Sequence, residues 1–336
     1  MKKLLIPTIL PTALFISVIA GFLWWKQNSR PPSGDKTPIR FVVQRGKSAA
    51  QIAQALYNQG LIKSPLAFKI YVQITGNAER INFGEFKLTP ALTLKEIVEA
   101  LQGSPAELWV TVPEGLRREE IVEKFIKGLE VEEPQASSFR SEFLLNSQDL
   151  EGFLFPDTYL FPRDASASAV VKKLKSTFDA KLTPELKDKI NKSGYSLQEI
   201  VTLASLLERE TKTDEERPIV AGIILNRLKA GWPLQIDATV QYAIGKAKCQ
   251  MSNVKCDSWW PILTKEDLEI NSPYNSYKFK GLPPTPIANS GFGSLKAAIE
   301  PQESEYWFYL HDNEGGIHYA KTIEEHNANI RKFLGK

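Results

Sequence analysis

The sequence is poor in the side chains that usually hold metals or form redox centres. It contains two cysteines, Cys249 and Cys256, and three histidines, His311, His318 and His326. A zinc site needs more ligands than the cysteine pair supplies, and no carboxylate or cysteine pattern surrounds the histidines. We therefore expect no metal and no other cofactor, and we expect the histidines to be solvated or structural.

The chain also lacks a strong excess of charge of either sign. Its formal net charge is +3 over 336 residues, and it has no long run of like charge, no low-complexity tract and no obvious repeat. Nucleic acids are recognised through concentrated basic surfaces, so we expect no such partner. The length is enough for about two domains. The composition therefore indicates a globular protein without a nucleic-acid interface.

Charge is absent from one long stretch near the N-terminus. The run 4–25 is uncharged, follows Lys2 and Lys3, and ends in two tryptophans. A helix needs ~20 apolar residues to cross a bilayer, and flanking lysines and interfacial aromatics orient it. We predict a cytoplasmic N-terminus and membrane anchor at residues 1–26, with a cleaved signal peptide as the alternative. A linker at 27–38 would carry the remainder outside the cytoplasm, where the cysteines could form a local disulfide.

A short pattern of strands and helices follows, from residue 39 to residue 105. Residues 39–43 and 83–88 alternate like strands, and Ser48 is placed as a helix N-cap. The order of a strand, a Gly-Lys-Ser turn and an Ile-Ala-x-x-Leu helix at 41–62 resembles a LysM domain, a glycan-binding module of cell walls. We therefore predict a small LysM-like α+β module, with a purely structural role as the alternative.

The most informative segment of the larger remainder is an apolar helix, predicted at about 196–211, that ends in two glutamates. Side chains three and four apart share a helix face, so Glu210 continues the leucine stripe that includes Leu206. Glu208 lies about 200° away around the helix. Burial raises a carboxyl pKa, and a carboxyl that stays protonated near neutral pH can act as a general acid. The alternative is a pair of glutamates solvated at a helix end.

Three loops after this helix are rich in tyrosine, asparagine and proline. They lie at about 234–242, 271–277 and 281–287. Tyrosine and asparagine offer an apolar ring face and hydrogen-bonding tips, which suit a sugar groove. Ordinary turn chemistry accounts for the same composition. Taken one at a time, the loops therefore favour the turn interpretation.

Taken together, these segments resemble the endolytic murein transglycosylases of the YceG/MltG family. The matching stretches are Val-Pro-Glu-Gly at 112–115, residues 151–159, Leu-Ala-Ser-Leu-Leu-Glu-Arg-Glu-Thr at 203–211, Asn-Arg-Leu at 226–228, and residues 234–242, 272–277, 281–287 and 294–298. They come in the family's order over nearly the whole chain, and the anchor and LysM-like module match as well. The predicted fold class is therefore α+β, with a transmembrane helix, the small module and a larger mixed α/β catalytic domain at 106–336.

The resemblance implies cleavage of the β-1,4 bond between N-acetylmuramic acid and N-acetylglucosamine in peptidoglycan strands, leaving a 1,6-anhydro muramyl end. Glu210 would be the catalytic residue, first as general acid and then as general base, and Glu208 would have a structural or supporting role. The residues assigned to substrate binding or transition-state support are Gln235, Asp237, Thr239, Tyr242, Tyr274, Asn275 and Tyr277.

Two other functions remain open from the sequence. A muramidase would use water in place of the sugar's own hydroxyl, with Asp237 as a second carboxylate. A non-catalytic scaffold would bind peptidoglycan and tether synthesis proteins. For the leading interpretation, the family implies nascent glycan strands, the membrane and peptidoglycan synthases as partners.

Overall fold

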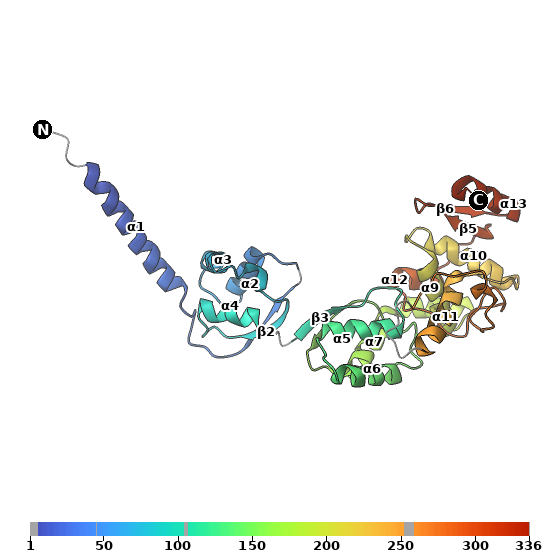
Figure 1. Cartoon of the computed structure of the whole chain (residues 1–336), viewed down its shortest axis with the longest axis horizontal. Coiled ribbons are helices and arrows are strands. Elements are labelled where there is room, and N and C mark those ends of the chain that lie inside the picture. Colours follow the sequence, from blue (N-terminus) through green and yellow to red (C-terminus); the bar gives the residue numbers. More distant parts are fainter. Residues whose placement is uncertain (1–5, 45, 104–106, 252–258, 336) are drawn as a thin grey trace. The chain divides into compact units, whose positions relative to one another are not determined.

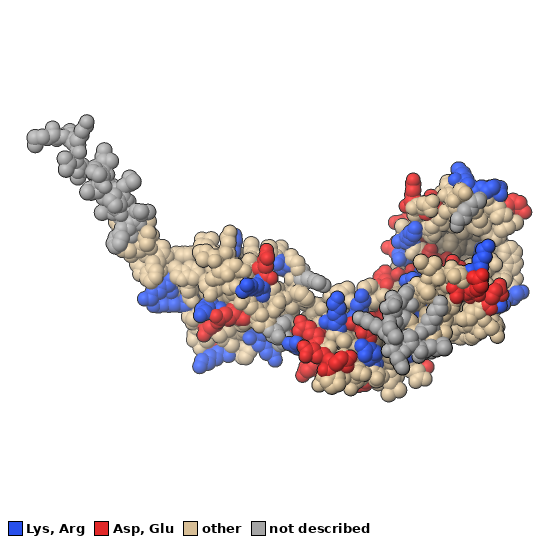
Figure 2. Space-filling model, in the orientation of Figure 1, with Lys and Arg blue, Asp and Glu red and all other residues tan. Residues whose placement is uncertain are grey.

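The computed structural model describes the chain except residues 1–5, 45, 104–106, 252–258 and 336 (Figure 1). The chain forms two compact units. The first comprises Met1–Val110 and Leu160–Asp164, and the second comprises Thr111–Tyr159 and Ala165–Lys336. Helices and strands both occur, so the protein is α+β. Acidic and basic side chains are both present over each unit on the face that Figure 2 shows.

The N-terminal helix α1 spans Ile6–Asn28, where the sequence predicts a membrane anchor. In the part of the chain that the structure describes, no helix combines the length and the hydropathy that crossing a bilayer requires. The last turns of α1 contact the rest of the first unit, because the ring of Trp25 stacks on that of Tyr71 with centroids 6.0 Å apart.

The rest of the first unit is a small module whose helices begin at polar caps. Its elements are β1 (Ile39–Val43), α2 (Ala49–Asn58), α3 (Pro65–Ile74), η1 (Ala78–Arg80), β2 (Gly84–Leu88) and α4 (Leu94–Gln102), with β3 (Glu107–Thr111) and β4 (Thr158–Pro162) completing a sheet of order β1-β2-β3-β4. Ser48 and Thr93 cap α2 and α4 in capping boxes, which confirms the predicted cap at Ser48. Phe41, Phe68 and Leu101 lie in the buried core. The likeness to a LysM domain stays a prediction.

The second unit is mainly helical, and its core surrounds α9. Its elements are α5 (Arg118–Gly128), α6 (Gln135–Asn146), α7 (Ala167–Lys181), α8 (Pro184–Ser193), α9 (Leu197–Glu210), α10 (Arg217–Lys229), α11 (Asp237–Met251), η2 (Asp267–Glu269), α12 (Phe292–Ile299), β5 (Phe308–His311), β6 (Ile317–Ala320), α13 (Ile323–Asn329) and η3 (Ile330–Leu334). Strands β5 and β6 pair as an antiparallel hairpin. Helices α10, α11 and α12 pack against α9, as Figure 1 shows.

Helix α9 is buried along its middle and polar at its two ends. It begins after Ser196, which forms a capping box with Glu199. Every residue from Ile200 to Leu207 is buried, and neighbouring helices and the loop segments at Gly152 and Ile287 contact this stretch. The last turn then carries Glu208 and Glu210 out of the core.

Helix α10 starts later than the sequence suggests. The spacing of apolar residues after Asp214 predicts a helix that begins at that residue, but α10 begins at Arg217. A helix from Asp214 would require an N–H group at Pro218 to bond the carbonyl group of residue 214, and proline has none. Pro218 instead lies in the first turn of α10, where no such bond is needed. Later in the chain, Cys249 is disulfide-bonded, and Cys256 lies outside the described residues.

Candidate active site

Glu210 emerges at the end of α9 beside the C-terminal hairpin. Its side chain is half-buried, and the Tyr309 hydroxyl on β5 donates a hydrogen bond of 2.8 Å to Glu210 Oε2. Burial raises the pKa of Glu210. The Tyr309 bond lowers it, the charge of Asp237 raises it, and the charges of His311 and Arg227 lower it, with a net upward shift. The carboxyl is therefore biased toward the protonated form that a general acid needs.

Asp237 and Tyr277 form a hydrogen-bonded pair near Glu210. The Tyr277 hydroxyl donates to Asp237 Oδ1 at 2.6 Å, and Asp237 is exposed at the start of α11. Gln235 is exposed in the preceding turn, where its φ of 57° is left-handed and its N–H donates to the Ser276 carbonyl at 3.1 Å. The structure thus brings Asp237 and Tyr277 to the predicted acid, with Gln235 in the same loop as Asp237.

The side chain of Arg227 on α10 links the segment that carries Asp237 to the one that carries Tyr309. Its Nε donates to the Trp307 carbonyl at 2.8 Å, and its Nη1 donates to the Leu234 carbonyl at 2.7 Å. One guanidinium therefore ties the loop before Asp237 to the start of the hairpin that carries Tyr309. Burial lowers the pKa of Arg227, but arginine remains charged at any physiological pH.

A second connection joins the hairpin to the turn after α9. His311 Nε2 lies 2.9 Å from the buried Glu216 Oε2, and Glu216 Oε1 accepts the Thr213 N–H at 2.5 Å. Burial raises the pKa of Glu216, but the hydrogen bonds from His311 and the backbone outweigh this effect and hold the pKa below its ordinary value. His311 thus helps to hold β5, and with it Tyr309, beside the end of α9.

Glu208 faces a different element from Glu210. Its Oε2 accepts the Gly291 N–H at 3.0 Å and the Ser294 hydroxyl at 2.7 Å. Gly291 is the N-cap of α12, so the carboxylate sits at the helix end that attracts negative charge. A Cβ at Gly291 would collide with the Glu114 carboxylate, 1.9 Å away. Glu208 therefore links α12 to α9. This agrees with the helical spacing, which predicts that Glu208 and Glu210 point to different sides of the helix.

Thr239 lies in the first turn of α11 and Asn275 lies in the loop after η2, and neither side chain faces a groove. Both are fully buried. The Thr239 hydroxyl is 2.9 Å from Ser276 Oγ, and Asn275 Nδ2 donates to two backbone carbonyls at 2.8 and 2.9 Å. Because neither side chain has free surface, we interpret both as supports of the loops, which revises their predicted contact with substrate.

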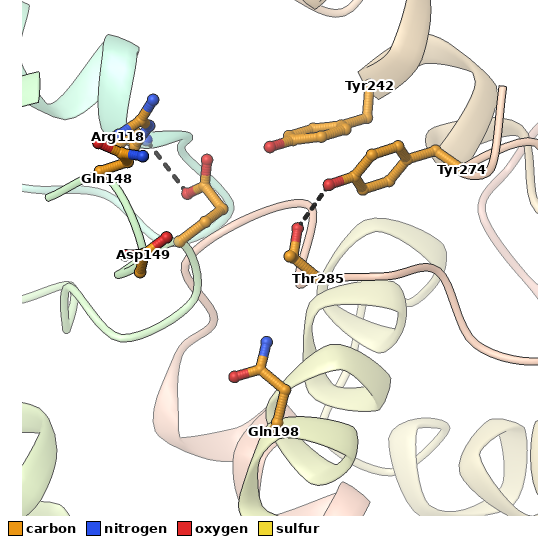
Figure 3. Close-up of a pocket in the computed structure, with 8 residues that line it drawn as sticks. Arg118, Gln148, Asp149, Gln198, Tyr242, Tyr274 and Thr285 are labelled. Carbon is orange, nitrogen blue, oxygen red and sulfur yellow. Dashed lines mark hydrogen bonds between the residues drawn. The ribbon is translucent and has the colours of Figure 1, made fainter.

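Tyr242 and Tyr274 point into a separate cavity of about 230 Å³ (Figure 3). Their ring centroids are 4.9 Å apart, and the Tyr274 hydroxyl is 2.7 Å from Thr285 Oγ1. Tyr242 follows Asp237 by five residues on α11 and so faces about 140° away from it. The seven predicted binding residues therefore lie in three places. Asp237, Tyr277 and Gln235 belong with Glu210 to what we call the Glu210 cluster. Thr239 and Asn275 are buried in the interior, and Tyr242 and Tyr274 line this cavity.

Sequence reasoning missed two residues that shape the Glu210 cluster. Tyr309 belongs to the run of four aromatic residues at 306–309, and Arg227 belongs to the Asn-Arg-Leu segment at 226–228. The aromatic run is a signal that could have identified the hairpin. Among the described residues, no group of three histidine, cysteine or acidic side chains is placed to hold a metal ion.

Comparison with known proteins decides the family. The model of the YceG-like family matches residues 41–332. The chain belongs to the YceG-like family. The match covers the Glu210 cluster, the Glu208 contact with α12 and the Tyr242 cavity, so these features lie within the region that defines this YceG-like protein.

Individual relatives agree with this assignment. An endolytic murein transglycosylase from Bacillus subtilis is 33% identical over 343 aligned positions, which cover 94% of this YceG-like chain and 91% of the relative. An endolytic murein transglycosylase from Streptococcus pneumoniae is 26% identical, covering 90% of this chain and 59% of the longer relative. The crystal structure of a yceG-like protein from Listeria monocytogenes has a TM-score of 0.54 and 28% identity, covering 88% of this chain and 99% of that one.

Proposed function

We propose that the chain is an endolytic murein transglycosylase, the activity for which its Bacillus subtilis and Streptococcus pneumoniae relatives are named. The substrate would be the glycan strand of peptidoglycan, cleaved between N-acetylmuramic acid and N-acetylglucosamine. The observation that carries the proposal is the half-buried Glu210 carboxyl at the end of α9, held by the Tyr309 hydroxyl at 2.8 Å. Burial raises the pKa of Glu210, which favours a proton on this carboxyl near neutral pH.

One carboxyl group can perform both proton transfers of this reaction. Glu210 donates its proton to the glycosidic oxygen as the bond to C1 breaks. The resulting carboxylate accepts the proton of the C6 hydroxyl of the same muramyl ring as that oxygen attacks C1. The product carries a 1,6-anhydro ring, no water is consumed, and Glu210 regains its proton. The Tyr309 hydroxyl stabilises the carboxylate that exists between the two transfers, because a hydrogen bond to a charged acceptor favours that form.

Asp237 and Tyr277 would stabilise the charged transition state. Positive charge develops on the sugar ring as the glycosidic bond breaks, and the exposed Asp237 carboxylate is the negative group nearest to Glu210 in the predicted set. Tyr277 fixes the orientation of that carboxylate by its 2.6 Å hydrogen bond. Gln235 extends from the same loop and would bind sugar hydroxyl groups.

One observation favours a second candidate function, a muramidase. Asp237 lies close enough for its charge to raise the pKa of Glu210, and glycoside hydrolases commonly use two carboxyl groups beside the scissile bond. Asp237 would then activate a water molecule, and the new ends would be reducing sugars.

The identity of the new ends tests the proposal. The full-length chain is incubated with uncrosslinked glycan strands, and the products are identified by mass spectrometry. We expect anhydro ends from the wild type and from Glu215→Gln, a matched change at an exposed glutamate, and none from Glu210→Gln. Reducing ends would indicate the muramidase. Glycan binding without cleavage would indicate the scaffold.

We also propose that an N-terminal anchor holds the catalytic unit outside the cytoplasm, near nascent strands and the synthases that make them. The proposal rests on the uncharged run 4–25 and on the preceding Lys2 and Lys3. The first unit would bind glycan there as a LysM-like module. Alkaline extraction of membranes from cells that express the chain tests the anchor, and full release into the supernatant would contradict it.

A further inference from the structure

Glu151 is a buried carboxyl with one unpaired oxygen. It lies between α6 and β4 and is 6% exposed. Its Oε1 accepts the Arg118 N–H at 3.2 Å and the Asn289 Nδ2 at 2.8 Å. Its Oε2 is buried and has no hydrogen-bond partner within the described chain. Burying a polar atom without a partner is unfavourable, so a ligand that supplied a hydrogen-bond partner to this oxygen would bind favourably.

The unpaired group lines the cavity that also receives Tyr242 and Tyr274. The cavity has a volume of about 230 Å³. In Figure 3 the two tyrosines extend their hydroxyl ends into it, and Gln148 and Gln198 lie at its other sides. Pockets for drug-sized molecules measure roughly 300–1,000 Å³. This cavity therefore suits a single ring rather than a long chain of sugars.

Burial biases the carboxyl of Glu151 toward its protonated form. Burial raises its pKa to about 8, and the charge of Glu119 acts in the same direction, while the charges of Arg117 and Arg118 oppose it. The phenol of Tyr242 also faces this carboxyl. The protonated acid can donate one hydrogen bond from the unpaired oxygen, which an ionised carboxylate cannot do.

The cavity has no excess of charge that would select an ion. Arg118 and Asp149 lie at its wall and carry opposite charges. Arg118 is engaged elsewhere, because its Nε donates to the Glu119 carboxylate at 3.2 Å and its Nη1 to the Leu144 carbonyl at 3.0 Å. Apart from Asp149 at the wall, what remains is a set of neutral donors and acceptors beside two aromatic rings. This combination matches a ring that carries several hydroxyl or amide groups and has an apolar face.

We propose that this cavity is a second saccharide-binding pocket, which takes one neutral sugar ring through Glu151, Tyr242, Tyr274 and Gln198. The inference rests on the proposed function, because the ring would belong to the glycan strand. Tyr242 follows Asp237 by about 7.5 Å along the axis of α11. Gln198 lies about 18 Å from Glu210 along the axis of α9. The pocket is therefore separate from the Glu210 cluster and would hold a ring other than the ones that react.

A pocket of this kind changes substrate affinity rather than the chemical step. Loss of a contact made equally in the bound and transition states raises KM and leaves kcat unchanged. Gln198 offers a clean test, because its side chain is exposed in the first turn of α9. Gln73→Leu, at an exposed glutamine in α3 of the first unit, is the matched control.

The experiment measures binding and cleavage on the same full-length proteins. N-acetylglucosamine is titrated into protein with ¹³C-labelled tyrosine rings, and NMR follows the Tyr242 and Tyr274 signals. We expect saturable shifts of both, with binding weakened about threefold to tenfold in Gln198→Leu and unchanged in Gln73→Leu. Binding should fall as the pH rises through about 8 in the wild type, because Glu151 then loses its proton. Glu151→Gln keeps a donor and an acceptor and should bind at both pH 7 and pH 9.

Several outcomes would overturn the pocket. It fails if the Tyr242 and Tyr274 signals do not respond to the sugar, or if Gln198→Leu binds as the wild type does. It also fails if Glu151→Gln, with a wild-type tyrosine spectrum in the free form, loses binding at pH 7. Cleavage separates the two proposals. If the sugar binds in the cavity but the protein leaves glycan strands intact, the proposed enzyme activity is wrong and the pocket stands. If cleavage is normal but the cavity does not respond to the sugar, the pocket is wrong and the enzyme activity stands.

Discussion

The two sides of the last turn of α9 differ in what they contact. On one side, Glu208 accepts hydrogen bonds from Gly291 and Ser294 at the start of α12. On the other side, Glu210 accepts one hydrogen bond from Tyr309 on the C-terminal hairpin. The first carboxylate has backbone and hydroxyl donors on one oxygen at a helix N-terminus. The second accepts a hydrogen bond from a single donor, the Tyr309 hydroxyl, and burial raises its pKa.

This difference shows how one helix can carry two glutamates with separate tasks. The side that faces α12 places the Glu208 carboxylate against two hydrogen-bond donors at a helix N-terminus, and these bonds hold the two helices together. Burial with few donors favours the protonated acid, so the side that faces the hairpin favours proton transfer. The identity of the residue is the same on both sides. The element packed against it decides what it does.

The largest expected effect follows from removing the proton donor. Glu210→Gln keeps the shape and can still accept the Tyr309 hydrogen bond, but an amide cannot transfer a proton. We expect kcat for glycan cleavage to fall about 10²- to 10⁴-fold, with no loss of folding stability. Product formation from defined glycan strands and urea unfolding measure the two quantities. If Glu208→Gln abolished cleavage and Glu210→Gln did not, the assignment of the two sides would be reversed.

The next largest effect is on folding stability, and it concerns Glu208 on the other side of the last turn of α9. Glu208→Ala leaves the Gly291 N–H and the Ser294 hydroxyl without their acceptor, which should lower the free energy of unfolding by about 1–3 kcal/mol. Chemical denaturation measures this change. Activity per folded molecule should fall far less than in Glu210→Gln. A variant with unchanged stability and no activity would show that Glu208 belongs to the chemistry.

A smaller effect tests the Tyr309 hydroxyl, which donates the hydrogen bond to the Glu210 carboxyl. Tyr309→Phe removes the hydrogen bond that lowers the pKa of Glu210 and leaves the ring in place. Without that bond, less opposes the effect of burial, so the pKa of Glu210 rises further. The acid then stays protonated to higher pH. The alkaline limb of the kcat/KM profile should therefore move to higher pH. Tyr306→Phe, in the same aromatic run, is the control. If the alkaline limb of the profile does not move, a group other than Glu210 sets its position.

The sequence predicts the helix that carries the acid, because local signals specify it. The Ser196 cap, the unbroken apolar stretch and the angular separation of the two glutamates all follow from short-range periodicity, and the structure agrees with each. The caps at Ser48 and Thr93 were predictable for the same reason. Such features depend on residues within one turn of each other.

Contacts between distant segments could not be predicted in this way. Tyr309 reaches Glu210 across 99 positions of the chain, and Arg227 joins two loops that no periodicity relates. Thr239 and Asn275 share the composition of exposed groove residues, but the loop closes on them and buries both. Tyr242 has the right chemistry for a sugar, yet the turn of α11 directs it away from Asp237. Tertiary packing decides each of these outcomes.

The smallest expected effect tests whether Gln235 contacts substrate on the Glu210 side. Its φ of 57° is a left-handed conformation that glycine adopts without strain. Gln235→Gly relieves about 1–2 kcal/mol of steric cost and loses about 0.5–1 kcal/mol to backbone entropy, so stability should rise by about 0–1.5 kcal/mol. Glu130→Gly, at an exposed residue with a φ of 55°, is the matched backbone control. If the Gln235 side chain binds a sugar hydroxyl, KM rises in Gln235→Gly and not in Glu130→Gly, and equal KM values would make Gln235 a turn residue only.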